Sequence, residues 1–218
     1  RLAVFGGPDE SGALMVYRAK SVNSERVVLL GPDIASDDGG TMSAVFAAAA
    51  VAAVIAGNTD PSVPINGAEL TLFGAAGKRL SDNEIDQLVR GGVTPIETGG
   101  GASSPVRGIT TKTSSGGAAD TTWRELTTIL IVDEVIPTIR SALRTRFARS
   151  KNTAQSRGAI RSQVVLELEE MKSREIVDSY GEVLVSALKS DPTVCLVEFS
   201  FTVAHGLNRI YLTAHITV

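Results

Sequence analysis

The end of the chain constrains its fold more than any other segment. From Val194 to Val218, apolar and polar residues alternate with a period of two, which predicts β-strands that bury one face. The first strand places on its apolar face Cys195, Val197, Phe199, Phe201 and Val203. The second strand follows a turn at 205–209 and places on its apolar face Ile210, Leu212, Ala214, Ile216 and Val218. A two-stranded ribbon alone is marginally stable in water, so we expect the terminal strand to pair within its domain or with a neighbouring chain.

The charge and hydropathy of the chain argue against nucleic acid and membranes as partners. The 218 residues carry a formal net charge of −3. Acidic and basic side chains are interspersed, so no overall field favours a nucleic acid or an anionic lipid surface. The longest apolar stretch, Ala44 to Ala56, is too short and too rich in alanine to span a bilayer. It predicts a buried helix instead.

Cys195 is the only cysteine in the chain, so a disulfide within the chain is impossible. Its place on the apolar face of a strand predicts a buried structural thiol rather than a nucleophile. The chain starts with Arg1-Leu2-Ala3-Val4-Phe5, which has no initiator Met and is typical of the middle of a strand. We therefore expect the sequence to be part of a longer protein.

The first half of the chain predicts strands and helices in alternation. The expected elements are a strand at 27–30, a helix at 42–55, a strand at 70–73, a helix at 81–91 and a strand at 93–96. Ser81 to Glu84 has the form of a capping box. The helix at 42–55 is apolar almost all round, so we expect it to be sandwiched between other elements. This order predicts an α/β fold with a mostly parallel sheet flanked by helices.

The second half predicts one more strand, a helix pair and the terminal antiparallel ribbon. Glycine-rich stretches, expected to be mobile loops, flank a strand at about 106–113. Pro137 would break a single helix, and residues 127–132 are mostly β-branched and apolar. We therefore expect a strand at about 124–130, then a helix with Pro137 in or near its first turn. A second helix at about 155–172 has one apolar stripe formed by Ile160, Val164, Leu168 and Met171.

Five cations gather in the C-terminal half of the first helix of this pair and at its exit: Arg140, Arg144, Arg146, Arg149 and Lys151. Two interpretations stay open. Cations at a helix C-terminus suit the helix dipole, which is a purely structural role. Five cations within twelve positions exceed what one helix end requires, so the cluster is also a candidate basic patch that faces an acidic partner surface.

The motifs of catalysis and of nucleotide binding fail in this sequence. Gly77-Lys78 does not form a phosphate loop, because Leu72 and Arg79 stand where that motif needs Gly and Ser or Thr. No Gly-x-Gly-x-x-Gly opens the first helix, and the chain has no Gly-x-Ser-x-Gly elbow. His205 and His215 belong to no cluster with metal-ligand spacing.

The acidic clusters of the sequence also have structural explanations. Asp37-Asp38 precedes a helix N-terminus, where acids are expected. Glu167, Glu169 and Glu170 lie on a helix beside basic residues. We therefore predict no enzymatic activity, no cofactor, and no catalytic, cofactor-binding or metal-binding residue.

The chain contains a characteristic series of segments. In order these are Val27 to Pro32 before an alanine-rich helix, Ser81 to Gly91, Gly92 to Ile96, Arg107 to Thr113, Ile131 to Ile136, Arg149 to Thr153, and the closing strand pair. That series resembles the tail sheath proteins of contractile-tailed phages and related injection particles, over nearly the whole chain.

The resemblance implies a structural subunit rather than an enzyme. In such sheaths an α/β core lies near the tail tube, many copies stack helically as rings of six, and neighbouring subunits exchange extended N- and C-terminal arms. The lattice shortens and widens to drive the tube through a target envelope. The expected partners are other copies of the chain, the tail tube protein, and baseplate and tail terminator proteins. The expected place is the virion tail, after assembly in the cytoplasm of the host bacterium.

The resemblance also divides the chain. Residues 1–120 are expected to be the α/β part of the sheath core, truncated at its N-terminus. Residues 121–218 are expected to be the C-terminal part with the helix pair and the strand pair, packed into one domain with the first. The basic patch would face the tube or a neighbouring subunit. The expected intersubunit strand consists of Ile210, Tyr211, Leu212, Thr213, Ala214, His215, Ile216, Thr217 and Val218.

Two alternative functions stay open. A small α/β enzyme or nucleotide-binding domain predicts convergent polar residues at the C-terminal ends of the parallel strands, where such sheets bind ligands. A non-contractile oligomerising scaffold predicts exposed edges without contraction. The sheath predicts loops at the strand ends and a functional surface spread over strand edges and helix faces.

Overall fold

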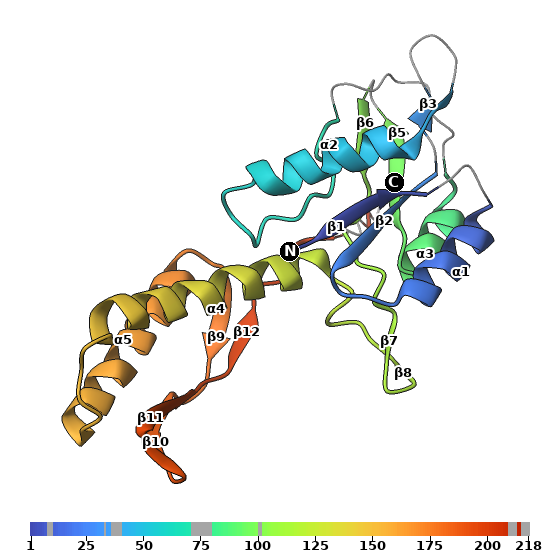
Figure 1. The fold of residues 1–218 in the computed structure, drawn as a ribbon. Helices are drawn as coiled ribbons and strands as arrows, with labels where there is room; N and C mark the ends of the chain where they lie inside the picture. Colours follow the sequence, from blue (N-terminus) through green and yellow to red (C-terminus); the bar gives the residue numbers. More distant parts are fainter. Residues whose placement is uncertain are drawn as a thin grey trace. The chain divides into compact units, whose positions relative to one another are not determined.

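The computed structural model describes residues 1–7, 11–32, 34–35, 41–70, 80–99, 102–208 and 213–214. The chain forms two compact units (Figure 1). Unit 1 comprises Arg1–Thr59, Val63–Ile129 and Gly206–Val218. Unit 2 comprises Asp60–Ser62 and Leu130–His205. Each unit has its own hydrophobic core.

Unit 1 is built on a four-stranded sheet. Its strands lie in the order β1-β2-β5-β6, with the bounds Ala3–Gly6, Val27–Gly31, Thr94–Gly99 and Ala102–Pro105. The pairs β1·β2 and β2·β5 are parallel, and β6 returns antiparallel to β5. The predicted α/β fold with a mostly parallel sheet is confirmed, and the strand expected at the start of the chain is β1.

Three helices flank this sheet: α1 Gly12–Val22, α2 Ala44–Gly57 and α3 Asp82–Arg90. Helix α3 begins with the predicted capping box, in which Ser81 and Glu84 satisfy each other's backbone N–H groups. Helices α1 and α3 pack against each other around Met15 and Leu88, while α2 packs against β1 and β2. The sequence prediction did not include α1.

The environment of α2 differs from the prediction. The helix buries one side only, through Ala44, Ala47, Ala48 and Val51. Its other side is open, and Phe46 is 61% exposed. A helix that is apolar all round has no sequence signal for which side is covered. Within the described part of one chain, the sheet covers one side, so the expectation of a sandwiched helix was wrong.

The segment from β6 to α4 is held in place by hydrogen bonds of polar side chains and contains only short strands. Strands β7 Ser114–Ser115 and β8 Ala118–Ala119 form a small hairpin. The strand predicted at 106–113 is absent, and an isolated bridge joins Ile109 to Glu125. Thr94 holds this loop instead, since its hydroxyl bonds both the carbonyl and the N–H of Ile109, at 2.9 and 3.1 Å.

Two further observations concern strands in the loops of unit 1. Strands β3 Ile34–Ala35 and β4 Thr41–Met42 pair with each other and were not predicted. Of the strand expected at 70–73, Leu70 forms an isolated bridge with Ser103. The remainder of that predicted strand lies outside the described residues.

Helix α4 Leu126–Phe147 contradicts the prediction of a strand followed by a helix, because it is continuous and contains Pro137. Its β-branched residues disfavour a helix by only tenths of a kcal/mol each, and an interior proline costs about 3 kcal/mol. Burial of each large apolar side chain contributes about 1.5–3 kcal/mol. The fully buried or nearly buried residues of α4 are Leu126, Ile129, Ile131, Val135 and Ile139. Their burial outweighs both penalties.

Unit 2 packs α4 against α5 Ala154–Ser173, as predicted, around a shared core. The predicted stripe of α5 is confirmed at Val164, Leu168 and Met171, which are buried. Two antiparallel strand pairs complete the unit. They are formed by β9 Val177–Tyr180 with β12 Phe201–Val203, and by β10 Leu184–Leu188 with β11 Asp191–Glu198.

The strand predicted from Val194 is split by the fold into β11 and β12, which have different partners. Its predicted apolar face is confirmed, since four of its residues pack against the core of unit 2: Val197, Phe199, Phe201 and Val203. Cys195 is half-buried, so the expectation of a buried thiol was wrong. It lies opposite Ala187 in a ribbon that solvent reaches on both sides.

Candidate functional site

The outer face of the β10·β11 ribbon carries exposed apolar side chains beside Ser186 and Glu198. Pairs such as Val185 with Val197 face the core of unit 2. The alternate residues point outward because successive side chains of a strand lie on opposite faces. Four of these are exposed by 37–52%: Leu184, Leu188, Val194 and Leu196. A two-stranded ribbon with exposed leucines is a candidate surface for pairing with another strand.

The first half of β11 is protected against pairing with a further strand. The register shifts between Ala187, which pairs with Cys195, and Leu188, which pairs with Asp191, so residues 192–194 form a bulge. The Asn152 side-chain amide donates hydrogen bonds to the carbonyls of Pro192 and Val194, at 2.7 and 3.3 Å. Pro192 has no N–H to donate. Bulges, prolines and side-chain contacts of this kind block strand addition.

Strand β10 has no such protection. Its five residues Leu184–Leu188 contain neither proline nor glycine. Within the described part of the chain, β11 is the one strand that pairs with β10. The edge of β10 that faces away from β11 therefore offers a row of backbone N–H and C=O groups to an incoming strand.

Replacing Asn152 with alanine is expected to lower the free energy of unfolding by about 0.5–1.5 kcal/mol, because its two hydrogen bonds to β11 and the one that its Oδ1 accepts from Arg157 are lost. The rate of aggregation should rise, because the edge of β11 opens. Urea unfolding and light scattering measure the two effects. Ser150→Ala is the matched control, since no side-chain bond of Ser150 is found in the described structure, and it should change stability by less than about 0.5 kcal/mol. Equal behaviour of the two variants would contradict this role of Asn152.

The predicted basic residues lie together on the exposed side of α4 and in the turn that follows. Arg146 donates a hydrogen bond to Gln163 of α5, and Gln163 donates to Glu167 at 2.6 Å, so Arg146 has a structural partner. In the described part of the chain no hydrogen bond or ion pair of the other four side chains is found: Arg140, Arg144, Arg149 and Lys151. Four cations for which the described residues supply no ion-pair partner favour a patch that faces a partner.

A shallow depression lies within this basic surface. Arg140 and Arg144 line it together with Pro137, Ser141 and Thr145, and its volume is about 530 Å³. The two arginines are one helical turn apart, so their guanidinium groups serve the same face of α4.

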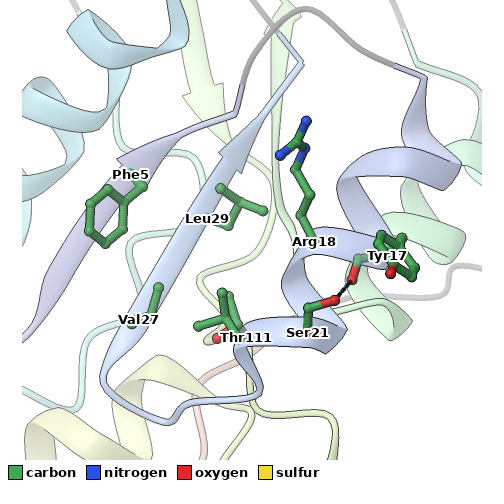
Figure 2. A pocket seen from close by; sticks show the side chains of 8 residues that line it. Phe5, Tyr17, Arg18, Ser21, Val27, Leu29 and Thr111 are labelled. Carbon is green, nitrogen blue, oxygen red and sulfur yellow. Dashed lines mark hydrogen bonds between the residues drawn. The ribbon is translucent and has the colours of Figure 1, made fainter.

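Unit 1 has an apolar groove between α1 and the first two strands (Figure 2). Phe5 of β1 and Leu29 of β2 line it from the sheet, Tyr17 lines it from α1, and Arg18 of α1 lies at its rim. Val22 of α1 also lines it. Its volume is about 520 Å³. Phe5 is 53% and Tyr17 72% exposed, which is unusual for aromatic side chains that adjoin a core.

The acidic residues considered as catalytic candidates have structural contacts. Glu167 accepts the bond from Gln163. Glu169 accepts a hydrogen bond from the Tyr180 hydroxyl, and this bond raises the pKa of Tyr180 above its ordinary value. Asp37-Asp38 lies outside the described residues. Among the residues that the structure describes, no group of His, Cys, Asp and Glu could hold a metal ion.

Two other predictions concern the end of the chain and membranes. Of the predicted intersubunit strand 210–218, residues 213–214 are described and have no strand structure; the rest, with His215, lies outside the described residues. His205 is exposed. In the described part of the chain, no helix is long and apolar enough to cross a membrane.

Comparison with known proteins gives a family for the C-terminal part. Residues 118–217 match the model of the phage tail sheath C-terminal domain. The chain carries a tail sheath domain. This matched range holds α4, α5 and the strand pairs of unit 2, so the sheath domain contains both the ribbon and the basic patch. No curated protein matches the chain.

Solved sheath structures have the same fold over nearly the whole chain. The sheath tail protein of Desulfitobacterium hafniense is 13% identical, with a TM-score of 0.68, over 91% of this chain and 48% of that one. The sheath tail protein of Listeria innocua is 15% identical, with a TM-score of 0.71, over 84% of this chain and 44% of that one. The contracted sheath of the extracellular contractile injection system PVC is 15% identical, with a TM-score of 0.70, over 100% of this chain and 64% of that one.

These matches decide between the classes of protein. The chain spans 44–64% of the length of these three proteins. The sheath domain and the fold are those of structural sheath proteins and not of enzymes. The resemblance stated from the sequence is therefore confirmed.

Proposed function

We propose that the chain is part of a contractile tail sheath subunit, which polymerises around a tail tube and contracts to drive the tube through a target cell envelope. The observation that carries this proposal is the sheath domain match at 118–217, combined with the sheath fold of the whole chain. Other sheath structures with this fold form helical assemblies and baseplates of injection particles.

The edge of β10 supports a specific mode of polymerisation. Its open backbone groups accept an extended strand from a neighbouring copy, and Ile210 to Val218 supplies that strand through its alternating apolar residues. Main-chain hydrogen bonds survive when side-chain contacts rearrange, which suits a lattice that must contract without falling apart. Strand exchange of this kind links subunits into rings of six, and the rings into a helical stack.

The basic patch on α4 supports a contact with an acidic surface of the tail tube or of a neighbouring sheath subunit. Its exposed arginines govern the rate and register of association more than the affinity. Baseplate and tail terminator proteins lie at the two ends of the stack. The protein works in the tail of the particle, which assembles in the cytoplasm of the bacterial host.

Reversing the charge of Arg140 and Arg144 to glutamate is expected to weaken assembly on tubes and to make it more sensitive to salt. Both side chains are exposed, so the melting temperature should change little. Co-sedimentation with tail tubes at several salt concentrations measures the effect. The matched control is Arg174→Glu, another exposed cation of unit 2 that lies outside the patch. If the control weakens assembly as much as the double reversal, the patch has no specific role.

The experiment that tests the function is electron microscopy of the full-length protein expressed alone. Long hollow cylinders are expected, because a sheath subunit carries the contacts for polymerisation in itself. Discrete monomers that retain a nucleotide or a metal ion in stoichiometric amount would contradict the proposal and support the alternative of a small α/β enzyme. Discrete closed oligomers would support the alternative of a non-contractile scaffold.

A further inference from the structure

Unit 1 exposes two apolar surfaces on opposite faces of its sheet. The first is the groove beside α1 (Figure 2). The second is the uncovered side of α2, where Val45 and Phe46 are each 61% exposed. Contiguous exposed apolar surfaces mark contacts with other molecules more often than scattered single residues do.

The strand register shows that the two surfaces lie on opposite faces. A Cβ atom on Gly6 would lie 2.1 Å from the backbone carbon of Ala44, so Gly6 faces α2. Phe5 is its neighbour in β1 and therefore faces the other way. Leu29 pairs with Phe5 in the parallel ladder, so both side chains point into the groove. Gly31 lies two residues after Leu29 in β2 and therefore lies on the same face of the sheet. It faces Met15 of α1, whose sulfur would lie 2.3 Å from a Cβ atom added to Gly31.

The groove is a gap in the cover of a parallel sheet. Parallel sheets are normally buried on both faces by helices. On the groove side, α1 packs against β2 and α3, and Phe5 of the edge strand β1 stays open. One additional helix, packed beside α1, would cover this part of the sheet.

The exposed side of α2 has the chemistry to fill that gap. The helix has no charged residue at any of its 14 positions. Its exposed residues include Phe46, which can serve as an aromatic anchor, and Ala49 and Ala53, whose small side chains let another backbone approach closely. The last turn of α2 has no basic residue, so its negative partial charge complements Arg18 at the rim of the groove.

We propose that α2 of a second copy of this chain docks into the apolar groove formed by Phe5, Tyr17, Val22 and Leu29. Because the two contributing surfaces differ and lie on opposite faces, the contact is head to tail. Each copy then offers a free groove at one face and a free α2 at the other, so the contact can repeat from copy to copy around a ring or along a helical stack. This contact is separate from strand addition at β10, which lies in unit 2.

Cysteine cross-linking of two variants of the full-length chain tests the proposal. Both variants carry Cys195→Ser, which removes the only thiol of these 218 residues, and any cysteine elsewhere in the full-length chain is replaced by serine as well. The α2 variant adds Phe46→Cys. The groove variant adds Tyr17→Cys. A second groove variant adds Val22→Cys instead, in case the sulfur at position 17 is too far from the sulfur at position 46 to form a disulfide. All three added cysteines replace side chains that are at least 51% exposed, so folding should be preserved.

A disulfide-linked dimer is expected when the α2 variant is mixed with a groove variant and oxidised, and neither variant should cross-link with itself. The mixed dimer should exceed by about ten-fold the dimer formed by the α2 variant with a control carrying Ser115→Cys, because a docked helix raises the effective concentration of the two thiols. Ser115 is exposed in the β7·β8 hairpin and lines neither the groove nor α2.

Three results would overturn the proposal. Self-cross-linking of the α2 variant would show that α2 pairs with α2, and self-cross-linking of the groove variants would show that two grooves meet. Mixed dimers no more abundant than the control would show that there is no docking. Cylinders of the unaltered protein are scored separately by electron microscopy, so cylinders without mixed cross-links contradict this contact and leave the proposed sheath function standing.

Discussion

Replacing Gly6 with alanine is expected to lower the free energy of unfolding by about 3 kcal/mol, the upper part of the range for an overpacked site. A Cβ atom at this position would lie 2.1 Å from the carbonyl carbon and 2.3 Å from the carbonyl oxygen of Ala44. Both are backbone atoms at the start of α2, so they cannot move aside as a flexible side chain would. Either β1 or the first turn of α2 must shift. Urea unfolding followed by circular dichroism measures the change.

Gly158→Ala is the matched control for this prediction. Gly158 lies inside α5, and nothing lies within 4 Å of an added Cβ atom. The same chemical change there should raise the free energy of unfolding by about 0.5–1 kcal/mol, because alanine favours a helix over glycine. If Gly6→Ala is neutral or stabilising, the close approach of β1 and α2 is contradicted.

Deleting residues 210–218 from the full-length protein is expected to abolish cylinder formation and to leave the core of unit 2 folded. In the proposed mode of polymerisation this segment supplies the strand that β10 of the next copy accepts, whereas the core of unit 2 is closed by β9 and β12 without it. Electron microscopy measures assembly, and hydrogen exchange of α4 and α5 measures the integrity of the core.

A substitution separates the role of the strand from the role of chain length. Replacing Leu212 and Ala214 with proline keeps all residues in place but removes two N–H donors, and it should abolish cylinders as the deletion does. Replacing Thr213 and Thr217, which the sequence pattern assigns to the polar face of the strand, with serine should preserve the cylinders. Normal cylinders from the deletion or from the proline variant would contradict strand exchange through this segment.

Local patterns predicted the parts of the fold that local chemistry determines. The capping box fixed the start of α3, and the apolar stripe of α5 identified its buried side correctly. The apolar face of 195–203 was also correct. These signals lie within a few residues of each other in the sequence, so no knowledge of distant contacts was required.

The errors arose where distant contacts overrode local preference. Pro137 and the β-branched residues of α4 argued for a break, but the core that α4 shares with α5 outweighs their cost. The loop at 106–113 has strand-like composition, yet Thr94 takes the backbone groups of Ile109 that a strand would have paired. Neither partner can be identified from sequence spacing.

The candidate surfaces were predictable to different degrees. The basic patch was visible as a dense run of cations, although the pairing of Arg146 with Gln163 was not. The role of Asn152 depends on carbonyls 40 and 42 positions away, and no local motif signals it. The groove could have been suspected from the aromatic residues Phe5 and Tyr17 in otherwise apolar segments, but the open face of β1 required the sheet order.

The measurement that most directly tests the account is a cryo-electron microscopy reconstruction of cylinders formed by the full-length protein. Strand exchange at β10 predicts an extended strand from a neighbouring copy, hydrogen-bonded along the free edge of Leu184–Leu188, with no strand added at the β11 bulge beside Asn152. A cylinder in which the edge of β10 faces solvent, or in which the added strand lies against the bulge of β11, would contradict it.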